Sequence, residues 1–364
     1  MKRIRSLLAA AAAAVLLLTA CSPAQPSDGS ASAGGETLVD CAGRTVQLPE
    51  QRDKIACLYA YTGHVAVLLG CEDRVAAVVD GLKRDALMQI KIPDIDSMPC
   101  PYTSGSINIE ELAAVSPDLI FLRASNLQDE GEMEKLTSLG IPAVVVEYVT
   151  MEDQINSISV MGQALDCEDR ANAYLDYYRS TIQMVKDRLS QLPEEDKLTV
   201  YHSVNEVVRT DIPQTLSYEV LEAAGCLNVV TDAQALQVDG EKGYVTVEQI
   251  YVWDPDVVLA NEPSAVEYFK TDDKFSGLRA VREGNVLQLP VGMSRWAHPG
   301  SLESPLAVLY LASTLYPEYF TDINIQDEIR SFYHDFFTLD LTDDQIADIL
   351  SGEGMRAPRE EAAA

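Results

Sequence analysis

Short apolar runs alternate with amphipathic runs along most of the chain. Segments 54–60 (KIACLYA) and 197–203 (KLTVYHS) are short and largely apolar, as expected of strands that a parallel sheet buries on both faces. Each is followed by a helical pattern that ends at a glycine, in LLGC (68–71) and EAAGC (222–226); glycine is common just beyond a helix end. This alternation predicts an α/β fold with mostly parallel sheets.

Two distant segments repeat a longer pattern. NIEELAAVSPDLIFL (108–122) and TVEQIYVWDPDVVLA (246–260) both begin with a helix-capping residue, run for one or two helical turns, reach Pro-Asp and enter an apolar strand. The Glu or Gln three residues after each cap predicts a capping box, and the proline ends the helix. The repeat predicts two similar α/β lobes, at 37–150 and 193–352.

A helical region at 151–192 separates the two lobes. Within it, apolar residues recur at steps of three and four between Ala171 and Leu189, which predicts one helix of about 24 residues and roughly 36 Å. Such a helix is long enough to join the lobes rigidly and to leave a ligand cleft between them. Three more helical patterns follow before an expected disordered tail; these segments are 301–316, 322–337, 342–352 and 353–364.

The first 36 residues differ in composition from the rest. Three basic residues among the first five precede a short apolar run, a pattern typical of a secretory signal peptide, here 1–20. LTAC (18–21) resembles a bacterial lipobox, which implies lipid on Cys21 and an anchor on the extracytoplasmic side of a membrane. An ordinary signal peptide without lipid is the alternative. Residues 21–36 are rich in Ser, Pro, Gly and Ala and predict a flexible linker.

The composition is strongly acidic, with a formal net charge of −30. Because nucleic-acid backbones bind basic surfaces, no nucleic-acid partner is expected, and a large net charge favours a soluble monomer.

Seven cysteines are present. Cys21 is assigned to lipid, and an exported chain permits disulfides among the others, although the sequence does not choose among their possible pairings. Apolar surroundings favour buried free thiols at Cys57, Cys71 and Cys226; the remaining cysteines are Cys41, Cys100 and Cys167.

In order and spacing, five segments resemble the substrate-binding lipoproteins of iron-complex ABC importers, the class that carries ferric siderophores, haem and cobalamin. The resemblance implies two lobes joined by one rigid helix, capture of an iron complex such as a ferric siderophore or haem, and delivery to a permease dimer with its ATPase. Cobalamin and an oxyanion such as molybdate remain alternative ligands. The segments are DCAGRTVQLPEQRDKIACL (40–58), GSINIEELAAVSPDLIF (105–121), GYVTVEQIYVWDPDVVLA (243–260), LRAVREGNVLQLP (278–290) and SRWAHPGSLESPLAVLYLASTLYPEYF (294–320).

The resemblance also implies a docking role for Glu110 and Glu248, which hold matching places in the repeat. An acidic residue on each lobe is expected to engage basic pockets of the permease dimer. A local explanation competes, because a carboxylate in the first turn of a helix is stabilised by the helix dipole. Matched placement on two lobes suits a partner with two-fold symmetry.

Ligands of α/β sheets lie beyond the carboxyl ends of the strands, and that rule selects the candidate ligand-binding residues. Arginine can donate two hydrogen bonds to carboxylate or catecholate oxygens, and Tyr and Trp offer wide faces for ligand rings. Arg295 and Trp296, adjacent in the sequence, are the leading candidates. The others are Tyr59, Tyr61, Arg84, Tyr102, Arg123, Tyr148, His202, Arg209 and Tyr244, with Ser104, Asn205, Lys242, Asn261 and His298 selected by the same rule.

The four histidines argue against a site for a bare transition metal, which needs three or four converging ligands. His64 and His334 are interpreted as core or surface residues, while His202 and His298 could approach the cleft. No metal site and no cofactor is therefore expected, although haem, which needs one axial Tyr or His, stays open as a ligand.

The sequence favours a binding protein over an enzyme. Neither a G-x-S-x-G nor an H-E-x-x-H motif is present, and there is no G-x-x-x-x-G-K-[ST] loop and no G-x-G-x-x-G turn. A membrane-tethered glycosidase using a pair of carboxylates and an adhesin remain the alternatives.

Overall fold

The computed structural model describes residues 36–103, 105–232, 236–239 and 242–357, all within one unit of the chain. The expected signal peptide, Cys21 and nearly all of the expected linker lie outside these residues, as does Ser104. Within the described ranges no helix is both long enough and apolar enough to cross a bilayer.

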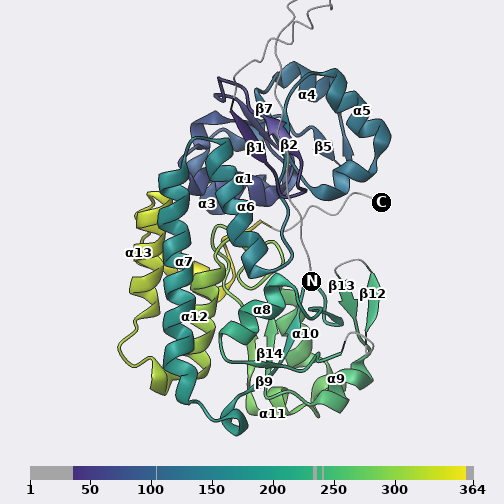
Figure 1. Cartoon of the computed structure of the whole chain (residues 1–364). Coiled ribbons are helices and arrows are strands. Elements are labelled where there is room, and N and C mark those ends of the chain that lie inside the picture. Colours follow the sequence, from purple (N-terminus) through teal and green to yellow (C-terminus); the bar gives the residue numbers. More distant parts are fainter. Residues whose placement is uncertain (1–35, 104, 233–235, 240–241, 358–364) are drawn as a thin grey trace, which may run out of the picture. The chain divides into compact units, whose positions relative to one another are not determined.

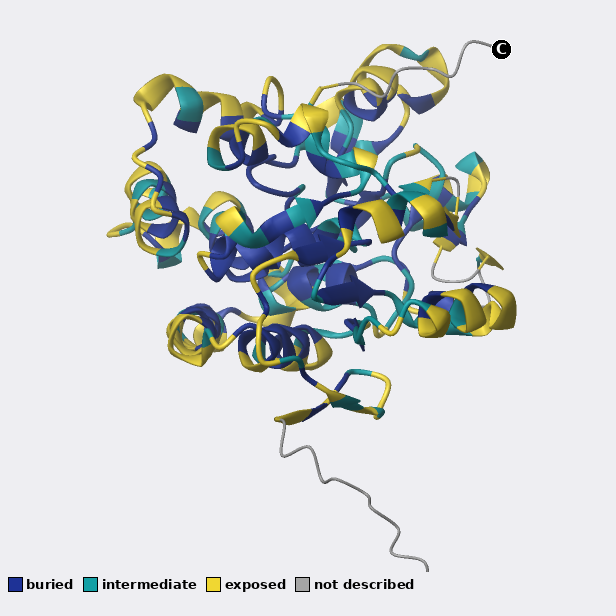
Figure 2. Cartoon of the chain, turned by 90° about the horizontal axis from the view of Figure 1, so that it is seen from above, coloured by how far each residue is buried: buried dark blue, intermediate teal, exposed yellow. Residues whose placement is uncertain are grey.

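The first lobe contains a four-stranded parallel sheet in the order β4-β3-β7-β8. Its strands are almost entirely buried, which explains why their sequences are apolar rather than alternating. Figure 2 shows the buried positions gathered in the interior and the exposed ones on the outer helix faces. The elements are β3 (Ile55–Cys57), α1 (Ala60–Leu68), β4 (Val75–Ala77), α2 (Asp80–Lys83), α3 (Ala86–Lys91), α4 (Ile109–Val115), β7 (Leu119–Leu122), α5 (Glu130–Ser138) and β8 (Ala143–Val145), with two antiparallel ladders, β1 (Thr37–Val39) with β2 (Thr45–Gln47) and β5 (Tyr102–Thr103) with β6 (Ser106–Ile107).

The second lobe, drawn mostly in green in Figure 1, repeats this topology. Its parallel sheet has the order β11-β9-β14-β15, so in both lobes the strands lie side by side in the chain order second, first, third, fourth. The fold of two parallel-sheet lobes predicted from the sequence is confirmed. The elements are β9 (Thr199–Ser203), α8 (Leu216–Ala223), β11 (Leu227–Asn228), α9 (Val247–Trp253), β14 (Val257–Ala260), α10 (Pro263–Thr271), α11 (Arg279–Glu283) and β15 (Val286–Gln288), with an antiparallel ladder of β10 (Arg209–Thr210), β13 (Lys242–Tyr244) and β12 (Gln237–Asp239).

The sequence repeat corresponds to α4 and α9. Asn108 and Thr246 cap these helices by accepting a hydrogen bond from the backbone N–H three residues later, and each helix ends at a residue in the left-handed region. The predicted capping boxes are incomplete in the described structure, because Glu111 accepts from the backbone N–H of Cys100 instead of that of Asn108. Each helix therefore has the N-cap half of the box.

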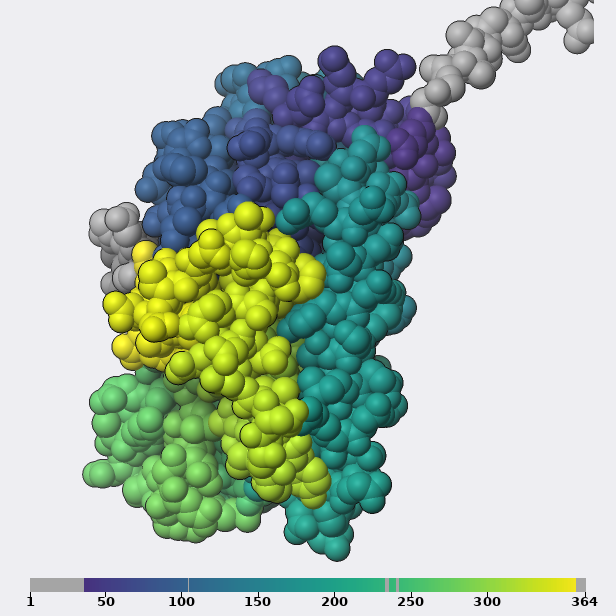
Figure 3. All heavy atoms as spheres, turned by 90° about the vertical axis from the view of Figure 1, so that its left-hand side faces the viewer, coloured from purple at the N-terminus to yellow at the C-terminus, as the bar shows by residue number. Residues whose placement is uncertain are grey.

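Between the lobes lie α6 (Met151–Ala164) and the long α7 (Glu168–Arg188), followed at the C-terminal end by α12 (Ser304–Leu315), α13 (Ile325–Phe337) and α14 (Asp343–Ser351). With 21 residues, α7 is about 32 Å long. Figure 3 shows the C-terminal helices, in yellow, packed beside α7, in teal.

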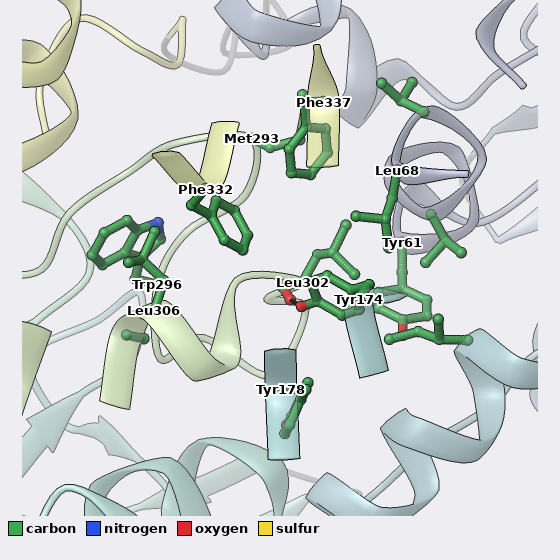
Figure 4. Close-up of a cluster of buried hydrophobic side chains, with 14 of the residues drawn as sticks. Tyr61, Leu68, Tyr174, Tyr178, Met293, Trp296, Leu302, Leu306, Phe332 and Phe337 are labelled. Atoms are coloured by element: carbon green, nitrogen blue, oxygen red, sulfur yellow. Dashed lines mark hydrogen bonds between the residues drawn. The ribbon is translucent and has the colours of Figure 1, made fainter. Parts of the chain in front are cut away.

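One hydrophobic core continues from the first lobe through these helices into the second. It includes Val65 of the first lobe, Tyr174 and Leu306 of the connecting helices, and Val200 of the second lobe. Figure 4 shows part of it, where Tyr174 and Tyr178 of α7 lie among side chains of α1 and the C-terminal helices. Each sheet has a separate smaller core on its other face. The lobes are thus joined by shared packing as well as by a connecting helix.

The end of the described chain differs from the expected disordered tail, which was drawn from residue 353 onward. Met355 is buried, its carbonyl accepts from the Ala86 N–H, and the backbone N–H of Ala357 donates to Arg84. A buried apolar side chain and two backbone hydrogen bonds oppose fraying, so residues 353–357 are attached to the first lobe. Residues 358–364 lie outside the described residues.

Candidate functional site

A cleft of ≈ 830 Å³ opens between the two lobes, where the loops that follow their strands face each other. Tyr59 and Arg123 follow β3 and β7 of the first lobe, and Arg209 and Arg295 come from the second. This placement is what the strand-end rule predicts. Of the candidate residues, the cleft brings together Tyr59, Tyr61, Arg123, Lys242, Arg209, Arg295 and His298.

The first-lobe wall is an aromatic corner. The guanidinium carbon of Arg123 lies 4.5 Å from the ring centroid of Tyr59, and the rings of Tyr61 and Tyr148 lie 4.4 Å apart. Tyr59 also donates its hydroxyl to that of Tyr148 at 3.3 Å. Burial raises the pKa of the Tyr61 and Tyr148 hydroxyls well above the ordinary value, so both are neutral donors at physiological pH.

Arg295 on the second-lobe wall is fixed in place by its neighbours. Its guanidinium donates to Glu262 at 2.5 Å and to the side chain of Asn205. His298 accepts from the Gly300 N–H at Nδ1, which leaves its Nε2 proton to be donated to Asn205 at 3.2 Å. Burial and the nearby Arg295 and Arg209 hold the pKa of His298 well below its usual range, so this histidine is a neutral donor.

Among the described residues, Arg209 is a cleft cation without a partner. Its guanidinium makes no hydrogen bond or ion pair with any residue that the structure describes, and its Nε is buried. The arginine is carried on β10, whose pairing with β13 fixes the backbone beneath it. Arg209 itself is half-buried; a buried N–H without a partner is costly, and an anionic ligand would supply an acceptor for this guanidinium.

The charge of the cleft is opposite to that of the whole protein. Its lining contains five cations and two carboxylates, whereas the chain carries a net charge of −30. Three of the cations are ion-paired, with Glu147, Glu262 and Asp85, which leaves Arg209 and Lys242 without an ion pair among the described residues. Clefts that concentrate one sign of charge attract ligands of the other sign. The site is therefore suited to an anion. The charged side chains are Arg123, Arg209, Lys242, Arg295, Arg356, Glu147 and Asp239.

His64 and Arg356 line the cleft although the sequence analysis assigned them elsewhere. Both contact Asp85: His64 through Nε2 at 3.1 Å and Arg356 by an ion pair. Burial lowers the pKa of His64 to about 4, and burial with the nearby Arg84 lowers that of Arg356 to about 10. His64 lies on the helix directly after β3, so the strand-end rule could have found it. Arg356 had no signal, because it follows the last predicted helix.

Two further candidates lie beside the cleft. Tyr148 lines a smaller pocket together with Arg209 and is absent from the lining of the larger cleft. Arg84 ends α2 and its Nη1 lies 3.5 Å from the Ala357 carbonyl, outside the cleft lining.

Four candidates are placed away from the cleft. Trp296 is fully buried. The preceding Arg295 lies in an isolated antiparallel bridge, and successive side chains of extended backbone point to opposite sides. Arg295 therefore faces the cleft and Trp296 faces the core. His202 is buried, with Nδ1 2.7 Å from Asp211 and Nε2 3.0 Å from Asn261. Tyr102 packs on the first-lobe core, and Tyr244 pairs with Arg209 through the backbone.

Among the described residues, no three or more His, Cys, Asp or Glu side chains are placed together so that they could hold a metal ion. The cleft is lined instead by donors of hydrogen bonds and by aromatic faces.

Comparison with known sequences decides the family. A profile of the Periplasmic binding protein family matches residues 55–291. The chain belongs to this family. The family consists of extracytoplasmic solute-binding proteins of ABC transporters, and this chain is one of them. Six of the cleft residues lie beyond the matched segment, among them Arg295, His298 and Arg356.

Known proteins similar to this family member cover most of its length. MolA, the molybdate-binding protein of Haemophilus influenzae, is 22% identical over 337 residues, which are 85% of this chain and 93% of MolA. A periplasmic solute binding protein from Veillonella parvula is 25% identical, with a TM-score of 0.74 over 86% of this chain and 96% of that one. CeuE of Helicobacter pylori with Ni(II) bound is 20% identical, with a TM-score of 0.70 over 86% and 99%. These similarities support the two-lobed fold.

Proposed function

We propose that this solute-binding protein captures an anionic iron(III) complex, a ferric siderophore with carboxylate or catecholate oxygens, and delivers it to the permease of an ABC importer. The observation that carries the proposal is the cationic cleft of an otherwise acidic protein. Guanidinium groups suit the oxygens of such ligands because they donate two parallel hydrogen bonds. The half-buried Tyr59 ring supplies a flat face for catechol or macrocycle rings.

The size of the cleft favours a bulky ligand. Its ≈ 830 Å³ lies in the range of pockets that hold drug-sized molecules and far exceeds what a bare ion occupies. The described residues also offer no cluster of metal-ligating side chains, so iron would enter already chelated. Haem is the neighbouring alternative, with Tyr59 as its candidate axial ligand.

A second candidate is an oxyanion such as molybdate. MolA binds molybdate and aligns with most of this chain. A small oxyanion would need a compact subsite, for which Arg209 offers a guanidinium without a partner among the described residues. The two candidates differ in the part of the cleft that they use, since the first-lobe Tyr59 and Arg123 would contact only a large ligand.

Isothermal titration calorimetry with the whole chain tests the proposal. The probes are a ferric tris-catecholate, a ferric tricarboxylate, their iron-free chelators, haem, cobalamin and molybdate. We expect binding of an anionic ferric complex, and a loss of affinity of about tenfold or more in Arg209→Gln, since a charge-assisted hydrogen bond contributes about 1.5–3 kcal/mol. Lys270→Gln, the same loss of charge on the exposed face of α10, is the control and should bind normally.

The outcomes separate the candidates. Binding of molybdate alone would support the second candidate, and binding of haem or cobalamin would move the ligand to another member of the importer class. A cleft that binds none of the probes would overturn the proposal. Equal affinity in Arg209→Gln and the native protein would exclude Arg209 from the site.

We also propose that the protein acts as a monomer anchored by lipid on Cys21. The strongly acidic composition disfavours self-association, and LTAC (18–21) matches a lipobox. Mass spectrometry of protein purified from its native host would detect the lipid, and a Cys21→Ser variant should be released from the membrane.

A further inference from the structure

Cys71 and Cys167 lie in contact although they are 96 positions apart in the chain. Their sulfur atoms are 3.3 Å apart, closer than two sulfurs in ordinary van der Waals contact, and neither is bonded to another cysteine. Cys71 follows α1 in the first lobe, and Cys167 lies in the turn between α6 and α7. The contact thus joins the first lobe to the start of the long helix.

Two matching helix ends place the sulfurs. The backbone N–H of Cys71 donates to the Ala66 carbonyl, and that of Cys167 donates to Gly162, each at 2.8 Å. Both bonds span five residues, as in the Schellman motif that closes a helix. The preceding residues, Gly70 and Asp166, are in the left-handed region with φ of 71° and 54°. Each cysteine therefore occupies a position that the helix end fixes.

Reciprocal arginine contacts hold the two turns together. Arg170 of α7 donates to the Leu68 carbonyl at the end of α1, at 3.1 and 3.3 Å. Arg74, just beyond Cys71, donates to the Leu165 carbonyl, just before Cys167, at 2.9 Å. The sulfurs lie between these two contacts, so little movement of the backbone separates them from bonding distance.

We propose that Cys71 and Cys167 form a disulfide that covalently links the first lobe to α7 in the exported protein. The chemistry needs an oxidant, which we assign to the class of organic or protein disulfides. The Cys167 thiolate attacks one sulfur of the oxidant and releases a thiolate. Cys71 then loses its proton to solvent and attacks the Cys167 sulfur, releasing the second thiolate; two electrons pass from the cysteine pair to the oxidant.

Burial sets the order of these steps. Cys167 is half-buried and open to an incoming oxidant, whereas Cys71 is 1% exposed. Burial and the neighbouring Cys167 raise the pKa of Cys71 to about 12, so its thiolate is scarce at neutral pH and it serves as the resolving cysteine. The second step should accelerate with rising pH.

Peptide mapping tests the bond directly. The full chain is incubated with oxidised glutathione, denatured, alkylated without reduction and digested. We expect a cross-linked pair of peptides containing Cys71 and Cys167, about 2 Da lighter than the two reduced peptides together. Alkylation of both cysteines after this treatment would refute the proposal.

Thermal unfolding supplies a second test with a matched control. Reductant should lower the Tm of the oxidised native protein by about 5 °C, since a disulfide restricts the unfolded chain. Cys226→Ser is the control. Cys226 follows α8 as Cys71 follows α1, is buried and has no cysteine partner among the described residues. The Tm of this variant should still fall when reductant is added. Cys167→Ser, at the half-buried site, should lose it. The same reductant effect in all three proteins would contradict the disulfide. The test does not depend on the ligand.

Discussion

Tyr148, at the end of the first lobe, donates its hydroxyl to the backbone carbonyl of Pro299, 3.0 Å away in the second half of the chain. Tyr148 is 6% exposed, so the bond is protected from water. We predict that Tyr148→Phe lowers the free energy of unfolding by about 1 kcal/mol, the usual net contribution of one hydrogen bond. Urea denaturation measures the change. An unchanged free energy of unfolding would mean that the bond contributes nothing to holding the lobes together.

Removal of the C-terminal segment should weaken ligand binding through Arg356. A chain ending at Gly352 loses this cleft-lining cation and the buried Met355, and we expect about a tenfold lower affinity for an anionic ferric complex, or roughly 1.4 kcal/mol. A chain ending at Ala357 keeps Arg356, its ion pair with Asp85 and the hydrogen bond from Ala357 to Arg84, and should bind normally. Calorimetry on both truncations makes the comparison, and equal affinities would remove Arg356 from the binding surface.

His64 should make the protein less stable in mild acid. Its pKa in the folded protein is about 4, below the ordinary 6.5, chiefly because it is buried; the charge of Glu303 opposes this shift and that of Arg356 adds to it. Between these values the unfolded chain binds a proton that the folded chain does not, so stability falls as pH drops from 6.5 toward 4, by about 3 kcal/mol in total.

The matched variant for this prediction is His64→Gln, which cannot titrate. Urea denaturation at several pH values between 4 and 7 should give a shallower loss of stability for His64→Gln than for the native protein. Parallel curves would show that His64 is not the group responsible, whatever the absolute stability of the variant.

Charge reversal of Glu110 and Glu248 should abolish transport and spare ligand binding. Both side chains are exposed in the first turns of α4 and α9, and hydrogen bonds with its own N–H and with Thr246 lower the pKa of Glu248, which keeps it charged. Uptake of the radiolabelled iron complex by cells carrying the cognate importer measures the loss, while calorimetry should give the native affinity.

The control for docking reverses two other exposed acids, Glu130 of the first lobe and Glu267 of the second. Glu130 also lies in the first turn of its helix, so it is stabilised by the helix dipole in the same way but does not belong to the repeat that contains Glu110 and Glu248. Glu130→Lys with Glu267→Lys should transport normally. Normal uptake by the Glu110 and Glu248 variant would leave the helix dipole as the reason for these carboxylates.

The fold could be predicted because its signals are local. The repeated helix before β7 and β14 is encoded by a capping residue and a Pro-Asp stop, and α7 by apolar residues at steps of three and four. These patterns depend on neighbouring residues, so they can be read without tertiary information. The shared core could not be predicted, since it joins Val65 to Leu306 through packing between distant segments.

The site was only partly predictable for the same reason. The strand-end rule found Tyr59, Arg123 and Arg209 because parallel strands bring their carboxyl ends to one edge. It does not say which of two adjacent side chains faces the cleft, and so it selected Trp296 together with Arg295. Arg356 reaches the site from the far end of the chain, and no local pattern announces such a contact.

The burial of Trp296 has a practical consequence for optical measurements. Its indole is sealed in the interior beside Tyr310, and the other tryptophan, Trp253, packs against the outer face of the second sheet. Neither indole lines the cleft, so a ligand would change their emission through energy transfer to a coloured complex rather than through contact. Absorbance of the coloured ferric ligand, or quenching of the cleft tyrosines, is the signal that follows loading.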